Sequence, residues 1–333
     1  MKIKKIAVIG SNSFFGSNFI NQVLSNTDWD ITGISRSPEY SNIFLPYLYK
    51  KERSKKFEFF QLDINKDFDD LVSLLDKEKP EVIVNFAAQG YVPASWENPE
   101  DWFRTNCLGI VKLADYLRRQ NYLKKYIQIS TPEVYGSCTN MKENITYFNP
   151  TTPYGASKAA GDLFLSALFQ TKKFPVSFVR VANVYGPHQQ PYKIIPSSII
   201  LFKKRKEIVL WAGGIKRNFI HVTDATNGIL KVILKGKPGR VYHLTAGKNI
   251  AIRNLIKMIC GKMGISYKDM VKDSSVSKVK RDKIYHLDGS HTEKALGWKP
   301  EISLSKGLDG VVEWVEECWG QLKSSPLNYI HKK

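Results

Sequence analysis

Tyr154 and Lys158 are the two side chains in this sequence whose types and spacing most directly suggest chemistry. They stand four residues apart, so on a helix they share one face. A free tyrosine is a poor base because its pKa is near ~10, but a cation held beside it favours the phenolate and lowers that pKa. The pair is therefore suited to exchanging a proton with a sugar or alcohol hydroxyl near neutral pH. The same spacing also arises by chance, so it needs support from other segments.

A glycine turn near the N-terminus provides that support. Residues 5–9 form an apolar run typical of a buried strand in a parallel sheet, and the apolar residues from Phe19 onwards have helical spacing. The turn between them, residues 10–16, has the strand–turn–helix context of a dinucleotide-binding site. Gly10 allows the tight turn, and Gly16 lets the helix pack closely on the sheet, so that the first helical amides face a pyrophosphate. An ordinary glycine turn of an unrelated α/β protein is the alternative.

Further segments follow in a characteristic order. They are residues 85–89 (Asn-Phe-Ala-Ala-Gln), 105–106, 130–136 (Ser-Thr-Pro-Glu-Val-Tyr-Gly), 183–187, 217–224 and 296–300. With the Tyr–Lys pair and the glycine turn, they resemble the extended short-chain dehydrogenase/reductase family, and more narrowly its nucleotide-sugar epimerases and 4,6-dehydratases of the dTDP-glucose and GDP-mannose types. The resemblance extends from about residue 4 to about residue 318. One departure lies in the turn, where Ser13 replaces the middle glycine of the family pattern Gly-x-x-Gly-x-x-Gly.

The resemblance implies a set of catalytic residues, which are Thr131, Glu133, Tyr154 and Lys158. In 4,6-dehydratases the threonine bonds the 4-hydroxyl of the sugar and the glutamate removes the C5 proton. An aspartate between them often protonates the departing 6-hydroxyl, but here Pro132 occupies that position. Since C5–H and the C6 oxygen are neighbours, Glu133 could serve as both base and acid. A structural role for Glu133 is the alternative.

The resemblance also implies binding residues. The expected cofactor residues are Gly10, Ser13, Phe14, Phe15, Gly16, Arg36, Asp63, Ile64, Ala87, Asn106, Tyr154 and Lys158. Asp63 and Ile64 would lie beside the adenine, and Asn106 would help to position Lys158. Asn183 and Arg217 would contact the substrate diphosphate, and Ser95 would lie near the sugar. For each of these, a turn or surface role is the alternative.

The residues after the second predicted strand bear on the choice of cofactor. An acidic residue there usually binds the 2′-hydroxyl of NAD ribose, whereas an arginine accommodates the 2′-phosphate of NADP. This chain has Ser35, Arg36 and Ser37, and a guanidinium flanked by hydroxyls suits a phosphate. We therefore expect NADP, with NAD as the alternative.

The composition excludes several classes of protein. The four cysteines are scattered without a CxxC pair, which argues against a metal site and a disulfide framework and favours the cytoplasm. The net charge of +19 comes from lysines spread along the whole chain, so we expect a solvated basic surface and no nucleic-acid partner. No apolar stretch approaches the ~20 residues needed to span a bilayer. Gly10 interrupts the first apolar run, which favours a β-strand over a signal peptide.

Buried strands alternate with helices in the first half of the chain. Strands are expected at 5–9, 30–34, 57–62, 82–86, 125–129 and 176–180, and helices at 102–120 and 154–171 among others. This pattern is typical of an α/β doubly wound parallel sheet of the Rossmann type. Residues 38–56 read as a loop with a short helix. The expected organisation is a dinucleotide-binding domain at 1–186, a smaller mixed α/β substrate domain at 187–323 with crossover segments, and a loosely held tail at 324–333.

The leading interpretation is a nucleoside-diphosphate-sugar 4,6-dehydratase, an enzyme with an internal redox cycle. An epimerase or 4-dehydrogenase that uses the same C4 oxidation is the first alternative, and a uronic-acid decarboxylase is a weaker one. A regulatory protein that binds NADP without turnover is the alternative from another class. The family resemblance further implies a homodimer through the helices at about 101–120 and 154–170, whose apolar residues have helical spacing.

Overall fold

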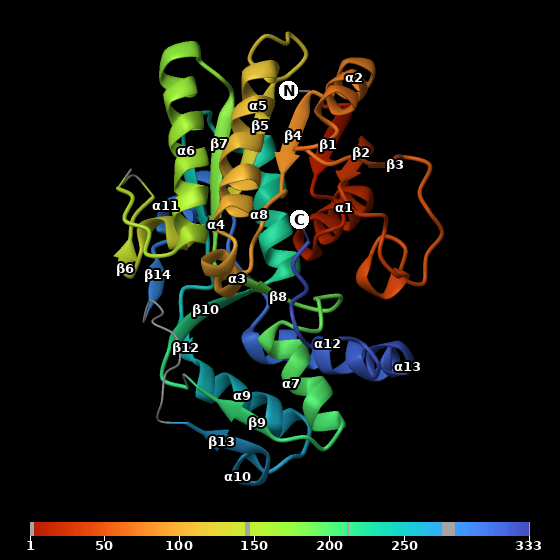
Figure 1. Cartoon of the computed structure of the whole chain (residues 1–333), viewed down its shortest axis with the longest axis vertical. Helices are drawn as coiled ribbons and strands as arrows, with labels where there is room; N and C mark the ends of the chain where they lie inside the picture. Colours follow the sequence, from red (N-terminus) through yellow and green to blue (C-terminus); the bar gives the residue numbers. More distant parts are fainter. Residues whose placement is uncertain (1–2, 144–146, 212, 275–283, 333) are drawn as a thin grey trace.

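The larger layer of the fold is a seven-stranded sheet in the order β11-β7-β5-β4-β1-β2-β3 (Figure 1). The computed structural model describes residues 3–143, 147–211, 213–274 and 284–332. All neighbouring strands of this sheet are parallel. They are β1 (Lys5–Ile9), β2 (Asp30–Ser35), β3 (Phe57–Gln61), β4 (Val82–Asn85), β5 (Lys125–Ser130), β7 (Val176–Val181) and β11 (Val241–Leu244). The predicted doubly wound sheet is confirmed, and β11 is a seventh strand that the sequence did not reveal.

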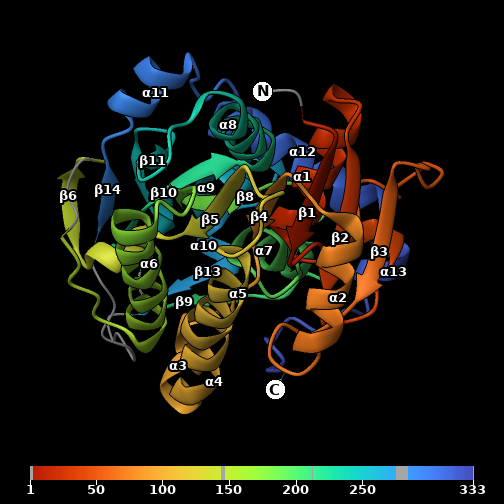
Figure 2. The ribbon, with the colours of Figure 1, turned by 90° about the horizontal axis from the view of Figure 1, so that it is seen from above.

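Helices cover both faces of the sheet, as Figure 2 shows. On one face, α1 (Phe14–Asn26) and α8 (Val222–Lys235) pack their apolar sides against β1, β4, β5 and β7. On the other face lie α2 (Phe68–Glu78), α5 (Gly109–Leu117) and α6 (Pro153–Lys172). Because both faces are covered, the strands are almost continuously apolar, as in other parallel sheets.

The helix α6 contains Tyr154 and Lys158, and its N-terminus is defined by two residues that favour the start of a helix. Thr152 is its N-cap, and the Thr152 hydroxyl accepts a hydrogen bond of 3.0 Å from the Gly155 amide. Pro153 takes the first helical position, where the missing N–H has no cost. The helix ends at Lys172, followed by Lys173 in the left-handed region at φ 57°. This capping fixes the residue at which the helix begins, and therefore the directions in which the Tyr154 and Lys158 side chains point.

The predicted helix at 102–120 is a composite of three segments. It consists of α4 (Pro99–Phe103), a π-helical turn η2 (Arg104–Leu108) and α5, preceded by the short helix α3 (Val92–Glu97). A π turn inserts one residue into a helix and re-aims its side chains, and such turns are frequent at functional sites. Asn106 lies inside this turn and is fully buried.

A smaller lobe lies below the carboxyl ends of the strands in Figure 1. Its elements are β8 (Asn183–Tyr185), α7 (Ile194–Lys203), β9 (Ile208–Leu210), β10 (Lys216–His221), β12 (Asn249–Ala251), α9 (Ile252–Lys262), α10 (Tyr267–Met270), β13 (Val271–Asp273), α12 (Leu304–Glu317) and α13 (Trp319–Leu322). Residues of α7, α9 and α12 form a separate apolar core. The lobe therefore folds around an apolar core of its own. A cleft lies between this lobe and the sheet.

Some segments after residue 186 return to the larger layer. The strand β11 pairs with β7, and α8 covers the sheet beside α1. At the edge, β6 (Cys138–Met141) pairs with β14 (Tyr285–Leu287), and α11 (Ser290–Leu296) follows. The insertion at 38–56 has loops and the short 3₁₀ helix η1 (Asn42–Phe44), and a second 3₁₀ turn, η3 (Pro132–Tyr135), follows β5. No helix in the described ranges is long and apolar enough to cross a membrane.

Candidate active site

A cleft of about 670 Å³ runs along the carboxyl ends of the strands, between the sheet and the smaller lobe. Ligands in open α/β sheets bind at this edge, where the strand order reverses, and here the reversal lies between β1 and β4. A narrower pocket of about 160 Å³ continues from it over β1 and β2. The cleft is lined by Ser13, Phe14, Phe15, Arg36, Thr131, Glu133, Tyr154, Lys158 and Asn183, and the pocket by Gly10, Ser13, Arg36, Asp63, Ile64 and Ala87.

The four expected catalytic residues therefore meet in one cavity. Tyr154 and Lys158 come from α6, while Thr131 and Glu133 follow β5. The Lys158 ammonium is buried and donates a hydrogen bond of 2.7 Å to the Ile129 carbonyl. Burial lowers the pKa of Lys158 to about 8, while the nearby Asp162 carboxylate opposes that shift.

The expected lowering of the Tyr154 pKa is wrong for the protein by itself. Burial raises the pKa of Tyr154, and the Glu133 carboxylate raises it further, whereas a hydrogen bond with Thr131 acts in the opposite direction. The physical reason is that desolvation and a like charge outweigh the single ammonium, which is turned to a backbone carbonyl. Burial and the neighbouring carboxylate therefore favour the neutral phenol of Tyr154, and a positive charge beside it would favour the phenolate.

Thr131 and Glu133 are positioned by the short turn η3. Thr131 is its N-cap, and the Thr131 hydroxyl accepts a hydrogen bond of 3.3 Å from the Glu133 amide. Pro132 occupies the first position of the turn, where a proline fits without loss of a backbone hydrogen bond. Pro132 is thus well suited to the local backbone, but its side chain adds no acid to the cleft.

The glycine turn has the geometry that its sequence predicts. Gly10 has φ 85°, and a Cβ there would lie 2.6 Å from the Ala87 nitrogen. A Cβ on Gly16 would lie 2.3 Å from the Gly10 carbonyl oxygen. Ser13, the replacement for the middle glycine, is the N-cap of α1, and its hydroxyl accepts from the Gly16 amide at 3.0 Å and donates to the Gly10 carbonyl at 2.7 Å. The serine therefore stabilises the turn from within.

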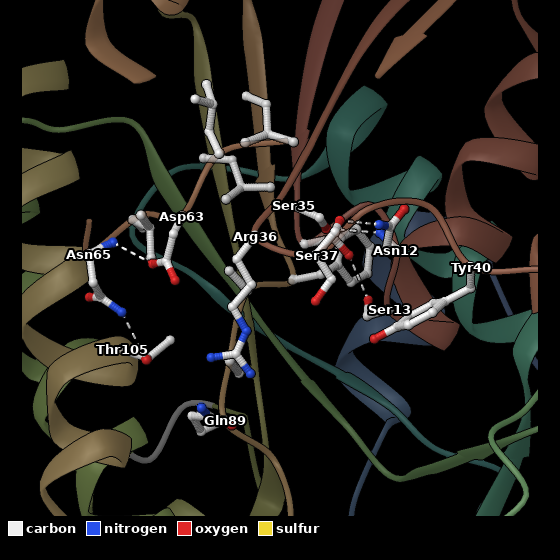
Figure 3. Close-up of a pocket in the computed structure, with 18 residues that line it drawn as sticks. Asn12, Ser13, Ser35, Arg36, Ser37, Tyr40, Asp63, Asn65, Gln89 and Thr105 are labelled. Carbon is white, nitrogen blue, oxygen red and sulfur yellow. Dashed lines mark hydrogen bonds between the residues drawn. The ribbon is translucent and has the colours of Figure 1, made fainter. Parts of the chain in front are cut away.

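Figure 3 shows the pocket over β1 and β2, with the Arg36 side chain extending into its centre towards Gln89. Asp63 lies on one side, where its carboxylate accepts a hydrogen bond of 2.7 Å from the Asn65 amide. Ser37 and Tyr40 lie on the other side. This donor-rich, partly apolar pocket fits the adenosine half of a dinucleotide, since Gly10 and Ala87 leave room for close approach of a ligand.

Four expected site residues do not line the cleft or the pocket, and one of them is Gly16, which packs against the Gly10 carbonyl inside the turn. Ser95 is fully buried in α3 and donates to the Val92 carbonyl at 2.7 Å, so it serves that helix. Asn106 bonds the backbone of Gln89 and the Ser157 hydroxyl at 2.9 to 3.0 Å, and therefore ties β4 to α6 beside Lys158. Arg217 on β10 places its guanidinium 4.7 Å from the ring centre of Tyr285, which does line the cleft.

A buried ion pair contacts the end of β5, the strand that leads to Thr131 and Glu133. The Asp162 carboxylate accepts from the Ser130 hydroxyl at 2.7 Å and from the Arg180 guanidinium at 3.3 Å, and both charged side chains are almost fully buried. Ser130 immediately precedes Thr131, so this pair helps to hold the end of β5. Removing either charge alone would leave the other buried and uncompensated.

Several lining residues were missed by the sequence interpretation. Lys193, at the start of α7, faces the Glu133 carboxylate across the cleft, and burial lowers the pKa of Lys193 while that carboxylate opposes the shift. Gln89, Tyr91 and Tyr192 also line it. A lysine at a loop–helix junction carries no pattern by which it could have been found.

The C-terminal segment is the larger correction. We expected a loose tail at 324–333, but residues 325–332 run from α13 back to the carboxyl edge of the sheet and line the cleft (Figure 1). Tyr329 stacks on Tyr91 with ring centres 4.4 Å apart, and His331 stacks on Trp102 at 5.1 Å. These aromatic contacts, between segments far apart in the sequence, hold the segment in place.

Comparison with known proteins agrees with this geometry. A family model described as GDP-mannose 4,6 dehydratase matches residues 8–311. The dTDP-glucose 4,6-dehydratase of Streptomyces niveus is 30% identical over 332 residues, which cover 96% of this chain and 96% of that protein. The dTDP-D-glucose 4,6-dehydratase of Mus musculus is 28% identical over 329 residues, which cover 97% of this chain and 91% of that protein. A crystal structure of dTDP-glucose 4,6-dehydratase from Bacillus anthracis in complex with NAD has a TM-score of 0.84 at 27% identity and covers 96% of this chain and 98% of that chain.

Proposed function

The chain belongs to the GDP-mannose 4,6-dehydratase family, and we propose that it is a nucleoside-diphosphate-sugar 4,6-dehydratase. One observation carries the proposal, namely that a single cleft joins the catalytic set to the dinucleotide turn. The residues concerned are Ser13, Phe14, Thr131, Glu133, Tyr154 and Lys158. A proton-exchanging group, a carboxylate base and a dinucleotide site in one cavity are what an internal redox cycle on a sugar requires.

A nicotinamide dinucleotide bound in this cleft would accept a hydride from C4 of the sugar and later return it to C6. Tyr154 would ionise more readily beside the positive charge of a bound oxidised nicotinamide. Tyr154 then takes the proton of the 4-hydroxyl as a 4-ketone forms. Thr131 orients the 4-hydroxyl of the sugar, because the Thr131 hydroxyl bonds with Tyr154 at the same place.

Glu133 carries the elimination step. The 4-ketone acidifies the C5 hydrogen, and the Glu133 carboxylate removes it as a proton. The same carboxyl group then protonates the neighbouring C6 oxygen, which leaves as water, because Pro132 provides no acid. Lys193 opposite Glu133 stabilises the ionised base. The proton that Tyr154 took from the 4-hydroxyl balances the proton returned to C5 at the end, so the sugar has lost one water and the cofactor is unchanged.

The test is incubation of the purified protein with a panel of nucleotide sugars, followed by product masses. A 4,6-dehydratase converts one of them to a product lighter by one water. The specific observation that favours a second candidate is Pro132 in place of an acid. A product of unchanged mass would indicate an epimerase, and a product lighter by two hydrogens a 4-dehydrogenase. Binding of a dinucleotide without any conversion would indicate a regulatory protein.

We further propose that NADP is the preferred dinucleotide. Arg36 extends into the adenosine pocket beside the Ser35 and Ser37 hydroxyls (Figure 3). A guanidinium pairs with a phosphate by charge-assisted hydrogen bonds, whereas NAD offers only a neutral hydroxyl there. Mass spectrometry of the cofactor released from the purified protein tests this. NAD as the sole released species would contradict the preference while leaving the dehydratase proposal intact.

A homodimer in the cytoplasm is the proposed state of the protein. Exposed apolar side chains gather on the helices α3, α4, η2 and α6, and they are Trp96, Phe103, Leu108 and Leu163. An exposed apolar patch of this kind marks a protein–protein interface, and most such interfaces join identical chains. The four free cysteines are consistent with a reducing compartment.

A further inference from the structure

The C-terminal segment, residues 325–332, is built into the wall of the cleft through aromatic side chains. Tyr329 stacks on Tyr91 at 4.4 Å and meets Tyr192 edge-on at 5.4 Å. The Tyr329 hydroxyl donates to the Gln89 side-chain oxygen at 3.3 Å. Gln89 lines both the cleft and the adenosine pocket, so Tyr329 anchors the segment where the two cavities join.

Two further contacts fix the last described residues. His331 stacks on the buried Trp102 at 5.1 Å and bonds the Asp101 carboxylate at 2.7 Å. The Gln89 side-chain amide donates to the Lys332 carbonyl at 2.9 Å. The contacts of His331 with α4 and the bonded Lys332 carbonyl therefore fix the backbone from which the Lys332 side chain extends.

This arrangement sends the Lys332 side chain to the end of β2. The Lys332 ammonium donates to the Ser37 hydroxyl at 3.3 Å and to the Tyr40 hydroxyl at 3.4 Å. It also lies 5.0 Å from the centre of the Tyr40 ring. Ser37 follows Arg36 in sequence, and Arg36 and Lys332, from opposite ends of the chain, both line the cleft where it adjoins the rim of the adenosine pocket.

Within the described part of the chain, neither Arg36 nor Lys332 forms an ion pair with a carboxylate. Asp63 lines the same pocket as Arg36 and accepts a hydrogen bond from the Asn65 amide. Two other acids are also engaged, since Glu39 pairs with Arg53 and bonds Tyr47, and Asp101 bonds His331. Two cations that line one cavity without a carboxylate partner create a positive potential that attracts an anion. The rim is therefore a site for a compact anion.

We propose that Lys332 is the second cation of a 2′-phosphate site, acting with Arg36 to select NADP over NAD, and that the segment 325–332 is part of the cofactor site. This inference rests on the proposed dinucleotide-dependent function. A 2′-phosphate carries a charge close to minus two at neutral pH, as other phosphate monoesters do. It would accept hydrogen bonds from the guanidinium, the ammonium and the Ser37 hydroxyl, and its charge would pair with both cations.

The expected effect on binding is specific to the phosphate. A hydrogen bond between charged groups contributes most where it is shielded from water, and Lys332 is exposed, so the lower end of the usual range applies. Lys332→Ala should therefore weaken NADP binding about 10-fold. It should leave NAD binding within about 2-fold, because the 2′-hydroxyl offers the ammonium no charge.

The experiment measures dissociation constants of NADP⁺ and NAD⁺ by calorimetry on cofactor-free protein. The variants are Lys332→Ala, Lys332→Arg, which keeps the charge, and Lys323→Ala as a matched control. Lys323 is an exposed lysine at the end of α13 with no side-chain hydrogen bond or ion pair among the described residues. The inference expects a loss of NADP affinity in Lys332→Ala alone, with Lys332→Arg close to the wild type.

The outcomes separate this inference from the proposed function. If Lys332→Ala weakens the binding of NADP⁺ and NAD⁺ equally, the segment contributes to the cofactor site without selecting for the 2′-phosphate, and the inference is overturned. The inference is also overturned if Lys332→Ala binds NADP⁺ as the wild type does, or if the wild type prefers NAD⁺. In each of these cases the dehydratase proposal stands. A wild-type protein that binds neither dinucleotide would overturn both.

Discussion

Glu133 is the residue on which the choice between the candidate reactions depends. Glu133→Gln should leave C4 oxidation intact, because Tyr154, Lys158 and Thr131 remain in the cleft. It should remove the general-base contribution to the elimination, a loss of ~10²–10⁴-fold in turnover. Reduced nicotinamide should then accumulate on the enzyme and be visible by its absorbance after the sugar nucleotide is added. Full activity of Glu133→Gln would rule out the proposed elimination.

Two companion variants make that measurement specific. Tyr154→Phe is the control, because it blocks the first step and should give no absorbance change. Pro132→Asp restores an acid beside the leaving hydroxyl. It should speed water loss if that step limits turnover, and loss of folding is its main risk because Pro132 begins the turn η3.

Lys158 should make the stability of the protein depend on pH. Burial lowers its pKa from about 10.5 to about 8. Below pH 8 the folded protein holds a buried charge, at a cost of about 3 kcal/mol. Between pH 8 and 10.5 the folded state releases the proton while the unfolded state keeps it, so the wild type gains stability as the pH rises.

The measurement compares the wild type with Lys158→Met, which keeps the volume and removes the charge. The stability advantage of Lys158→Met, from denaturant unfolding at pH 7, should shrink by pH 10. Lys172→Met, at an exposed position of the same helix, serves as control and should show no such trend. An advantage that stays constant over this range would mean that the pKa of Lys158 is not lowered by folding, because the folded and unfolded states would then hold the proton equally.

At the scale of the elements, Ser13 tests how the glycine turn tolerates its missing middle glycine. Its hydroxyl caps α1 through the Gly16 amide at 3.0 Å. Ser13→Ala should therefore cost about 1 kcal/mol of stability, whereas Ser13→Gly should cost only a few tenths, as is usual for N-cap replacements. Thermal or denaturant unfolding of both variants measures this. Equal stability of Ser13→Ala and the wild type would show that the cap contributes nothing.

The π turn η2 is the element that was least predictable from the sequence. Its apolar periodicity continues from α4 into α5, so the pattern indicates one regular helix. The extra residue of the turn directs Asn106 towards Gln89 and Ser157, where its amide links the end of β4 to α6. Asn106 therefore acts on the site through the placement of α6, rather than by a direct contact with Lys158.

For the whole molecule, the exposed apolar patch predicts the oligomeric state. Leu163 is 50% exposed on α6, and a charge at the centre of a dimer interface is strongly disfavoured. Leu163→Glu should therefore convert a dimer into a monomer, as measured by light scattering at micromolar concentration. Leu234→Glu is the matched control, because Leu234 is 52% exposed on α8 at the opposite face of the sheet. A wild type that is already monomeric would contradict the proposal.

The sequence alone determined the sheet and the glycine turn, because both depend on local spacing, whereas the set of four candidate catalytic residues came from the family resemblance. Apolar periodicity specified six of the strands. The order of β1, glycine turn and α1 specified the place where a dinucleotide could bind. Tyr154 and Lys158 share a helix face, and Thr131 and Glu133 follow a strand that ends at the same edge, so their meeting in one cleft followed from the topology.

Only the tertiary structure decided the features that depend on contacts between distant segments. The raised pKa of Tyr154 arises from burial and from Glu133, and neither is visible in the spacing of the Tyr–Lys pair. The family resemblance places Ser95 near the sugar, but its hydroxyl instead bonds the Val92 carbonyl within α3. The segment 325–332 has no periodicity of its own, and its place over the cleft comes from stacking on Tyr91 and Trp102. Local pattern encodes which elements form, whereas such long-range contacts are set by how the finished elements fit together.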